Sequence, residues 1–154
     1  MQGDPAIIEL LNDVLTAELT AINQYFVDAK MLQNWGLKKL GDHFHDDSID
    51  EMKDADELIE RILFLDGVPN LQRLGTVRVG ETPVEKLELA LDLERAAIER
   101  LNAGIARCAE VGDNGSRELL EKILHGEEEH ADWLETQLAA IRQTGLENYL
   151  AQQL

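Results

Sequence analysis

The chain of 154 residues is long enough to form one domain of ordinary size, residues 1–154, with a substantial core. Hydrophobic residues at 44% and charged residues at 29% are typical of a soluble globular protein and exclude a disordered one. The formal net charge of −17 argues against binding to nucleic acid or to an anionic membrane. The sequence has no long apolar run and no signal pattern after Met1, so we expect a cytoplasmic protein.

Helical periodicity predicts two long helices in the first half of the chain. The first opens at Asp4 and Pro5, which suit the cap and the first turn of a helix, and it ends near residues 34–36. The second spans about residues 37–65 and carries two apolar lines. A helix that is apolar on two sides usually buries two surfaces, here one inside its own bundle and one against a partner subunit.

Residues 66–82 contain three glycines and a strand-like segment, Thr76–Val79. An extended segment of this length spans roughly 55 Å. A helix of about 29 residues is only about 44 Å long. The segment can therefore run the full length of a bundle, which predicts that the second and third helices are parallel.

The second half of the chain repeats this plan. Thr82–Glu85 forms a capping box with proline in the first turn, and the third helix follows it. Residues 112–115 predict a turn, and the fourth helix ends at Thr144 and Gly145. Residues 146–154 suffice for a short fifth helix. The predicted fold is all-α: a ferritin-like four-helix bundle with a long crossover loop and a short C-terminal helix.

The fourth helix carries a Glu-x-x-His pair, Glu127 and His130. Residues three apart share one helix face, and leucines on either side place this pair on the buried stripe. A carboxylate in an apolar stripe is costly unless a cation or a donor compensates it. A metal ion compensates it, and glutamate with neutral histidine suits iron, manganese or zinc.

An internal repeat makes this signal specific. At an offset of 76 positions Glu51 corresponds to Glu127, and Asp54 corresponds to His130. The same offset relates Glu18 to Glu94, each followed four residues later by isoleucine. Glu18 alone would resemble a residue at the rim of the core, but its repeat partner favours an inward position.

Four helices would bring six polar side chains together at the middle of the bundle. These are Glu18, Glu51, Asp54, Glu94, Glu127 and His130. Two glutamates plus two Glu-x-x-His-type pairs form the dinuclear carboxylate site of ferritin-like bundles. Two adjacent Fe(II) ions can pass two electrons together to O₂ or H₂O₂. The competing explanation, buried acids neutralised by lysine or arginine, is disfavoured because no basic residue falls on the predicted inward stripes.

The sequence also resembles the bacterioferritin family over essentially its whole length. The resemblance is carried by Met1–Asp4, Ala21–Phe26, Asn34–Leu37, Ser48–Met52, Arg61–Leu65 and Asp132–Thr136. It implies a cage of 24 subunits that oxidises Fe(II), stores a ferric mineral and binds haem b between two-fold-related subunits. It also implies a ferredoxin-type reductant for iron release.

Carried over residue by residue, the resemblance makes Glu18, Glu51, Glu94, Glu127 and His130 the catalytic metal ligands, and Met52 the axial haem ligand. Met52 lies about 100° around the helix from Glu51 and so faces away from the bundle. Without the resemblance, the pattern around Met52 indicates only packing at a subunit interface.

Asp54 departs from the family, which usually has histidine there. A carboxylate still binds iron, but it is shorter and adds negative charge, which could slow oxidation. The alternative function is a haem-binding shell subunit with weak or no ferroxidase activity, in a mixed cage with a second bacterioferritin subunit.

Two more functions can be built on the same kind of bundle. A peroxidase or manganese catalase is disfavoured by Met52 and the full-length resemblance. A DNA-binding miniature ferritin is disfavoured by charge and by the position of the ligands.

Two further features each leave two interpretations open. An acidic and histidine-rich segment, residues 43–50, either lines an inner cavity that passes iron to the mineral or is a solvated helix face. Tyr25 is either a core residue or an electron donor.

Overall fold

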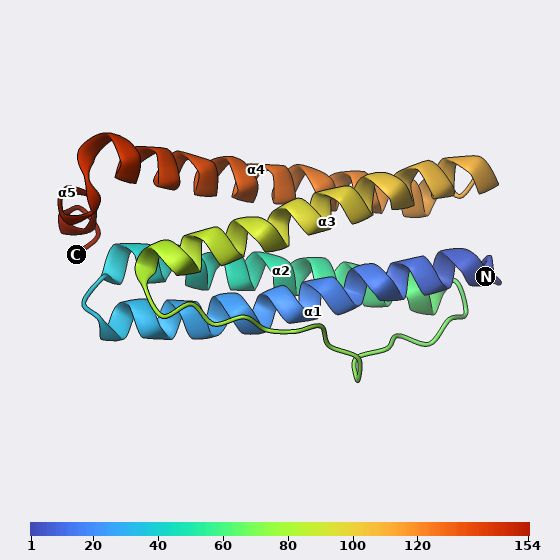
Figure 1. Cartoon of the computed structure of the whole chain (residues 1–154). Coiled ribbons are helices and arrows are strands. Elements are labelled where there is room, and N and C mark those ends of the chain that lie inside the picture. The colour runs from blue at the N-terminus through green and yellow to red at the C-terminus, as the bar shows by residue number, and fades with distance from the viewer.

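The computed structural model describes all 154 residues and contains five helices and no strand, which confirms the predicted all-α fold. The helices are α1 (Pro5–Asn34), α2 (Lys38–Phe64), α3 (Pro83–Val111), α4 (Asn114–Thr144) and α5 (Leu146–Ala151). Four long helices lie side by side, and α5 folds across one end of the bundle (Figure 1).

The predicted helix starts are largely confirmed. The side chain of Asp4 accepts a hydrogen bond from the Ala6 amide, and that of Thr82 accepts one from the Glu85 amide. The turn is shorter than the predicted residues 112–115, because α4 already begins at Asn114. Asp113 caps this helix: its side chain accepts a hydrogen bond of 3.0 Å from the Ser116 amide. Gly112 ends α3 with φ of 74°, a conformation that favours glycine.

The crossover loop runs back along α1 from the end of α2 to the start of α3, so α2 and α3 are parallel (Figure 1). Side chains of α1 hold this loop. Three backbone amides of the loop donate hydrogen bonds to these side chains: Asn70 to Asn12, Gly75 to Thr20, and Arg78 to Gln24. The strand-like segment 76–79 forms no strand because no neighbouring strand is present to pair with it, and its Arg78 amide donates instead to the Gln24 side chain of α1.

The apolar core consists of two clusters at opposite halves of the bundle. One, near α5, includes Tyr25, Phe44 and Leu134, and the other, near the N-terminus, includes Leu11 and Leu58. Along each long helix, the two clusters are separated by one inward glutamate. These glutamates are Glu18, Glu51, Glu94 and Glu127. The middle of the bundle is therefore a polar layer between two apolar ones.

One basic side chain is fully buried, although no basic residue falls on the predicted inward stripes. Lys86 of α3 is 0% exposed, and its Nζ donates to Asp28 Oδ1 at 2.9 Å. The same nitrogen lies 5.4 Å from the centre of the Trp35 ring. Lys86 thus neutralises Asp28 within the bundle and forms no ion pair with any of the inward glutamates.

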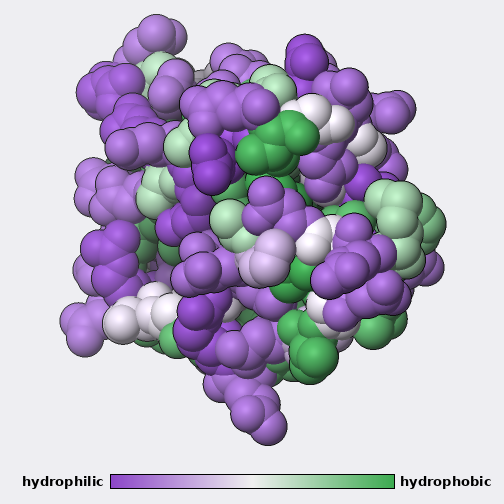
Figure 2. Space-filling model, turned by 90° about the vertical axis from the view of Figure 1, so that its right-hand side faces the viewer, coloured by the Kyte–Doolittle hydropathy of each residue, from purple (hydrophilic) through white to green (hydrophobic).

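The end of the bundle that carries the N-terminus is mostly hydrophilic, with separate hydrophobic patches between charged side chains (Figure 2). This agrees with the high negative charge of the chain. No helix combines the length and the low polarity that crossing a lipid bilayer requires.

Candidate metal centre

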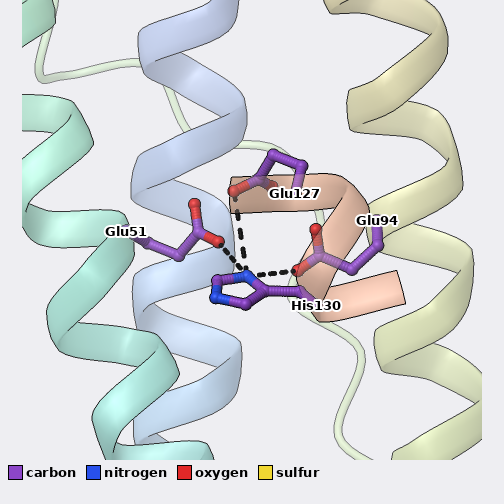
Figure 3. A group of neighbouring side chains, drawn as sticks. All are labelled: Glu51, Glu94, Glu127 and His130. Atoms are coloured by element: carbon purple, nitrogen blue, oxygen red, sulfur yellow. Dashed lines mark ion pairs between the residues drawn. The ribbon is translucent and has the colours of Figure 1, made fainter. Parts of the chain in front are cut away.

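Helices α2, α3 and α4 bring three carboxylates around one imidazole (Figure 3). His130 Nδ1 lies 3.1 Å from an oxygen of Glu51, 3.4 Å from one of Glu94 and 3.8 Å from one of Glu127. Glu127 and His130 reach the same point because they are one turn apart on α4. This group offers three oxygens and one nitrogen to a single ion.

A second group of four carboxylates adjoins the first. Glu18, Glu51, Asp54 and Glu127 each offer an oxygen, and these oxygens all lie within 4.8 Å of one another. Glu51 and Glu127 belong to both groups. Two shared carboxylates between two groups of donors can bridge two ions. The structure therefore brings together all six residues that the sequence predicts for a dinuclear site.

The glutamates of this centre are almost inaccessible. Glu18, Glu51, Glu94 and Glu127 are at most 2% exposed, and each has at least one buried carboxylate oxygen without a hydrogen-bond partner. No lysine or arginine pairs with them, and Lys122 pairs with Glu57 instead. Buried carboxylates without partners are rare in stable proteins unless a cation compensates them.

In the metal-free protein, protons balance this negative charge. Burial disfavours the charged imidazole, but the carboxylates of Glu51, Glu94 and Asp47 raise the pKa of His130 to about 12. Burial also raises the pKa of Glu51. Burial and repulsion from Glu51 and Glu94 raise the pKa of Glu127 well above its ordinary value. A metal ion must therefore displace protons from its ligands.

Asp54 is the half-buried member of the centre. Burial, with repulsion from Glu51 as the next cause, raises the pKa of Asp54 to about 7. It contributes to the all-carboxylate group only, whereas His130, its counterpart in the repeat, contributes to the group that contains nitrogen. The two halves of the centre thus differ in donor atoms.

Tyr25 connects the centre to the apolar core near α5. It is 1% exposed, and its hydroxyl donates a hydrogen bond to a carboxylate oxygen of Glu94. Burial and the charge of Glu94 raise the pKa of Tyr25 well above its ordinary value, so it stays a donor. Its ring packs edge-on against Phe44, whose ring in turn contacts Trp133.

Two acids that sequence reasoning did not assign to the centre contact the far side of His130. Oxygens of Asp47 and Asp50 each lie 3.4 Å from His130 Nε2. Asp47 is 6% exposed, and its other oxygen lies 3.3 Å from His43 Nε2. Spacing places Asp47 on the same face of α2 as Glu51, one turn before it, but does not indicate that either acid contacts His130.

A cavity of about 200 Å³ connects the carboxylates with the surface. It lies between α1, α3 and the crossover loop at Gly75, and its lining includes Glu18, Glu51 and Glu127. Asp13 and Arg100, which also line it, are exposed. The cavity therefore lies between the carboxylates and exposed side chains at the surface.

Met52 lies apart from the centre. Its side chain is 52% exposed on the outer face of α2, beside the half-buried Ile49 and Ile59. The predicted outward direction of Met52 is therefore confirmed.

Residues 8–144 match the ferritin-like domain family. Among curated proteins, bacterioferritin from Mycobacterium leprae is 52% identical over 152 residues, which are 99% of this chain and 96% of that protein. Bacterioferritin BfrA from Mycobacterium tuberculosis is 51% identical over the same shares of both chains. Bacterioferritin from Streptomyces coelicolor is 48% identical over 98% of this chain and 90% of its own length.

The raised pKa values of His130 and Glu127 predict that metal binding releases protons. Anaerobic addition of Fe(II) to the metal-free protein in weak buffer near pH 7, followed with a pH indicator, should acidify the solution. For each proton that Fe(II) displaces, the apparent affinity of the protein for Fe(II) should rise about tenfold for every unit by which the pH is raised. The variant Glu127→Gln lacks one of these titratable groups, so its binding of Fe(II) should release fewer protons than that of the wild type. An affinity for Fe(II) that does not change with pH would contradict protonation of His130 and Glu127 in the metal-free protein.

Proposed function

Because this chain belongs to the bacterioferritin family of ferritin-like proteins, we propose that it stores and detoxifies iron by oxidising Fe(II) at its dinuclear carboxylate centre. The ferric product is deposited as a mineral inside a cage of 24 subunits. The observation that carries this proposal is the pair of buried donor groups that share Glu51 and Glu127 without any lysine or arginine partner.

The proposed ligands have distinct roles. Glu51 and Glu127 bridge the two iron ions, Glu94 and His130 complete one coordination sphere, and Glu18 and Asp54 complete the other. Two Fe(II) ions held in this way supply two electrons together, which with two protons reduce O₂ to H₂O₂, or H₂O₂ to water. Fe(II) and the oxidant enter through the cavity lined by Glu18 and Gly75.

The residues around the ligands orient them. When His130 Nδ1 faces iron, its Nε2 is free to donate a hydrogen bond to Asp47 or Asp50, each 3.4 Å away. Such a bond fixes the tautomer and the ring orientation. Tyr25 likewise directs Glu94 by donating to one of its oxygens. Asp50 is exposed, so it also offers Fe(III) or a proton a route from the centre to solvent.

The alternative function is a haem-binding shell subunit with little ferroxidase activity, in a mixed cage with a second bacterioferritin subunit. Asp54 favours it, because the second half of the centre has only carboxylate donors and Asp54 itself is half-buried. Such a subunit would hold at most one iron ion, at His130.

Haem b is the second part of the proposal. Met52 offers an exposed thioether flanked by apolar residues, and nothing in the chain covers it. Two copies of this face, related by two-fold symmetry, would place one thioether on each side of a haem iron. The cage, its cytoplasmic location and a ferredoxin-type reductant that releases iron complete the proposal.

Anaerobic titration of the metal-free cage with Fe(II) distinguishes the two functions. A ferroxidase should bind two equivalents per subunit, the second more weakly at Asp54, and a shell subunit should bind one or none. Asp54→His should tighten the second equivalent by on the order of tenfold. It should also raise the initial rate of aerobic oxidation in stopped-flow measurements. Equal rates in both proteins would show that Asp54 does not limit the reaction.

Met52→Leu should abolish haem binding and leave Fe(II) binding unchanged, because Met52 points away from the glutamates. Haem is added to the haem-free protein, and the Soret absorbance per subunit is measured after gel filtration. Met31→Leu, which removes a thioether elsewhere in the bundle, serves as the control and should retain haem. Full haem occupancy in Met52→Leu would rule out this ligand.

A further inference from the structure

The two halves of the centre differ in the kind of metal that they suit. The half at His130 combines three carboxylates with one imidazole nitrogen. The half at Asp54 contains oxygen donors only, from Glu18, Glu51, Asp54 and Glu127. This asymmetry arises from one position, because Asp54 occupies the place that corresponds to His130 in the internal repeat.

The all-oxygen half is a built site and not a patch of surface acids. Glu18, Glu51 and Glu127 are at most 2% exposed. One oxygen of Glu18 and both oxygens of Glu51 are buried without a hydrogen-bond partner. Lys122 pairs with Glu57 and forms no ion pair with Asp54. Four carboxylates thus converge on a space that no lysine or arginine fills.

Donor type determines which divalent ion such a space prefers. Imidazole ligands suit iron and zinc, whereas sites made of carboxylates suit manganese, magnesium and calcium. Magnesium keeps several waters and usually takes only one or two carboxylates. Calcium requires six to eight oxygens in a flexible shell, whereas these oxygens come from rigid helices. Manganese is the ion that best fits an enclosed group of four carboxylates.

We propose that the half-site formed by Glu18, Asp54 and the shared glutamates favours Mn(II) relative to Fe(II) more than the His130 half-site does, so that Mn(II) enters the first half-site and Fe(II) the second. This inference rests on the proposed dinuclear centre and specifies its metals. Loaded with both ions, the chain holds one iron and one manganese bridged by Glu51 and Glu127. Manganese in place of a second iron lowers the number of Fe(II) ions bound at each subunit.

The test is a competition on the intact metal-free cage under anaerobic conditions. Two equivalents each of Mn(II) and Fe(II) per subunit are added, so that either metal could fill both half-sites. Loosely held ions are then removed by gel filtration at high salt, and both metals are counted by elemental analysis. The wild type should retain about one manganese and one iron per subunit. The six-line electron paramagnetic resonance signal of Mn(II) should broaden when iron is present, because shared carboxylates couple the two ions.

Asp54→His supplies the missing nitrogen and should lower manganese retention by on the order of tenfold, with iron taking its place. Asp56→His, the same change at an exposed position two residues away on α2, should retain manganese like the wild type. Glu51→Gln removes a shared ligand, so any manganese that it retains is bound at the surface and is subtracted.

Failure of the manganese preference and failure of the dinuclear centre give different results. Two iron ions and no manganese in the wild type, or equal manganese in wild type and Asp54→His, would overturn the manganese preference and leave the iron centre intact. Binding of neither metal above the Glu51→Gln background would overturn the dinuclear centre itself.

Discussion

The structure depends on how the bundle tolerates carboxylates at its centre. Each of the four long helices places one glutamate between two apolar clusters, and these glutamates are almost completely buried. Like charges so close together in a low-dielectric interior repel one another strongly. Protons on His130 and Glu127 relieve this repulsion in the metal-free protein. Metal ions relieve it while leaving the carboxylates ionised, which couples metal binding to the stability of the fold.

The topology follows from the same constraint. A centre with a ligand from every long helix requires all four inward faces to meet at one level. The long crossover loop makes α2 parallel to α3 (Figure 1). Side chains of α1 such as Thr20 and Gln24 hold that loop in place through hydrogen bonds. The loop in turn forms part of the cavity wall beside Glu18. The segment that sets the topology therefore also shapes access to the centre.

Much of this could be predicted from the sequence, because helical periodicity and an internal repeat both mark the inward glutamates. Caps at Asp4 and Thr82 fixed two helix starts. The buried Lys86 was missed because lysine is seldom buried, and its partner Asp28 lies far away in the sequence. Asp47 and Asp50 were missed because their role depends on which way the His130 ring faces, which spacing does not encode.

Metal ions, and not lysine or arginine side chains, are what we infer to hold the buried glutamates together. The most direct measurement is the thermal unfolding temperature of the metal-free protein with and without anaerobic Fe(II), for the wild type and for the Glu51→Gln, Glu127→Gln double variant. We expect Fe(II) to raise the unfolding temperature of the wild type markedly and that of the double variant little. Without metal, the double variant should be at least as stable as the wild type. Two results together would contradict this inference: a wild type whose unfolding temperature does not rise with Fe(II), and a double variant whose free energy of unfolding is lower by about 3–5 kcal/mol, the cost of breaking a buried ion pair.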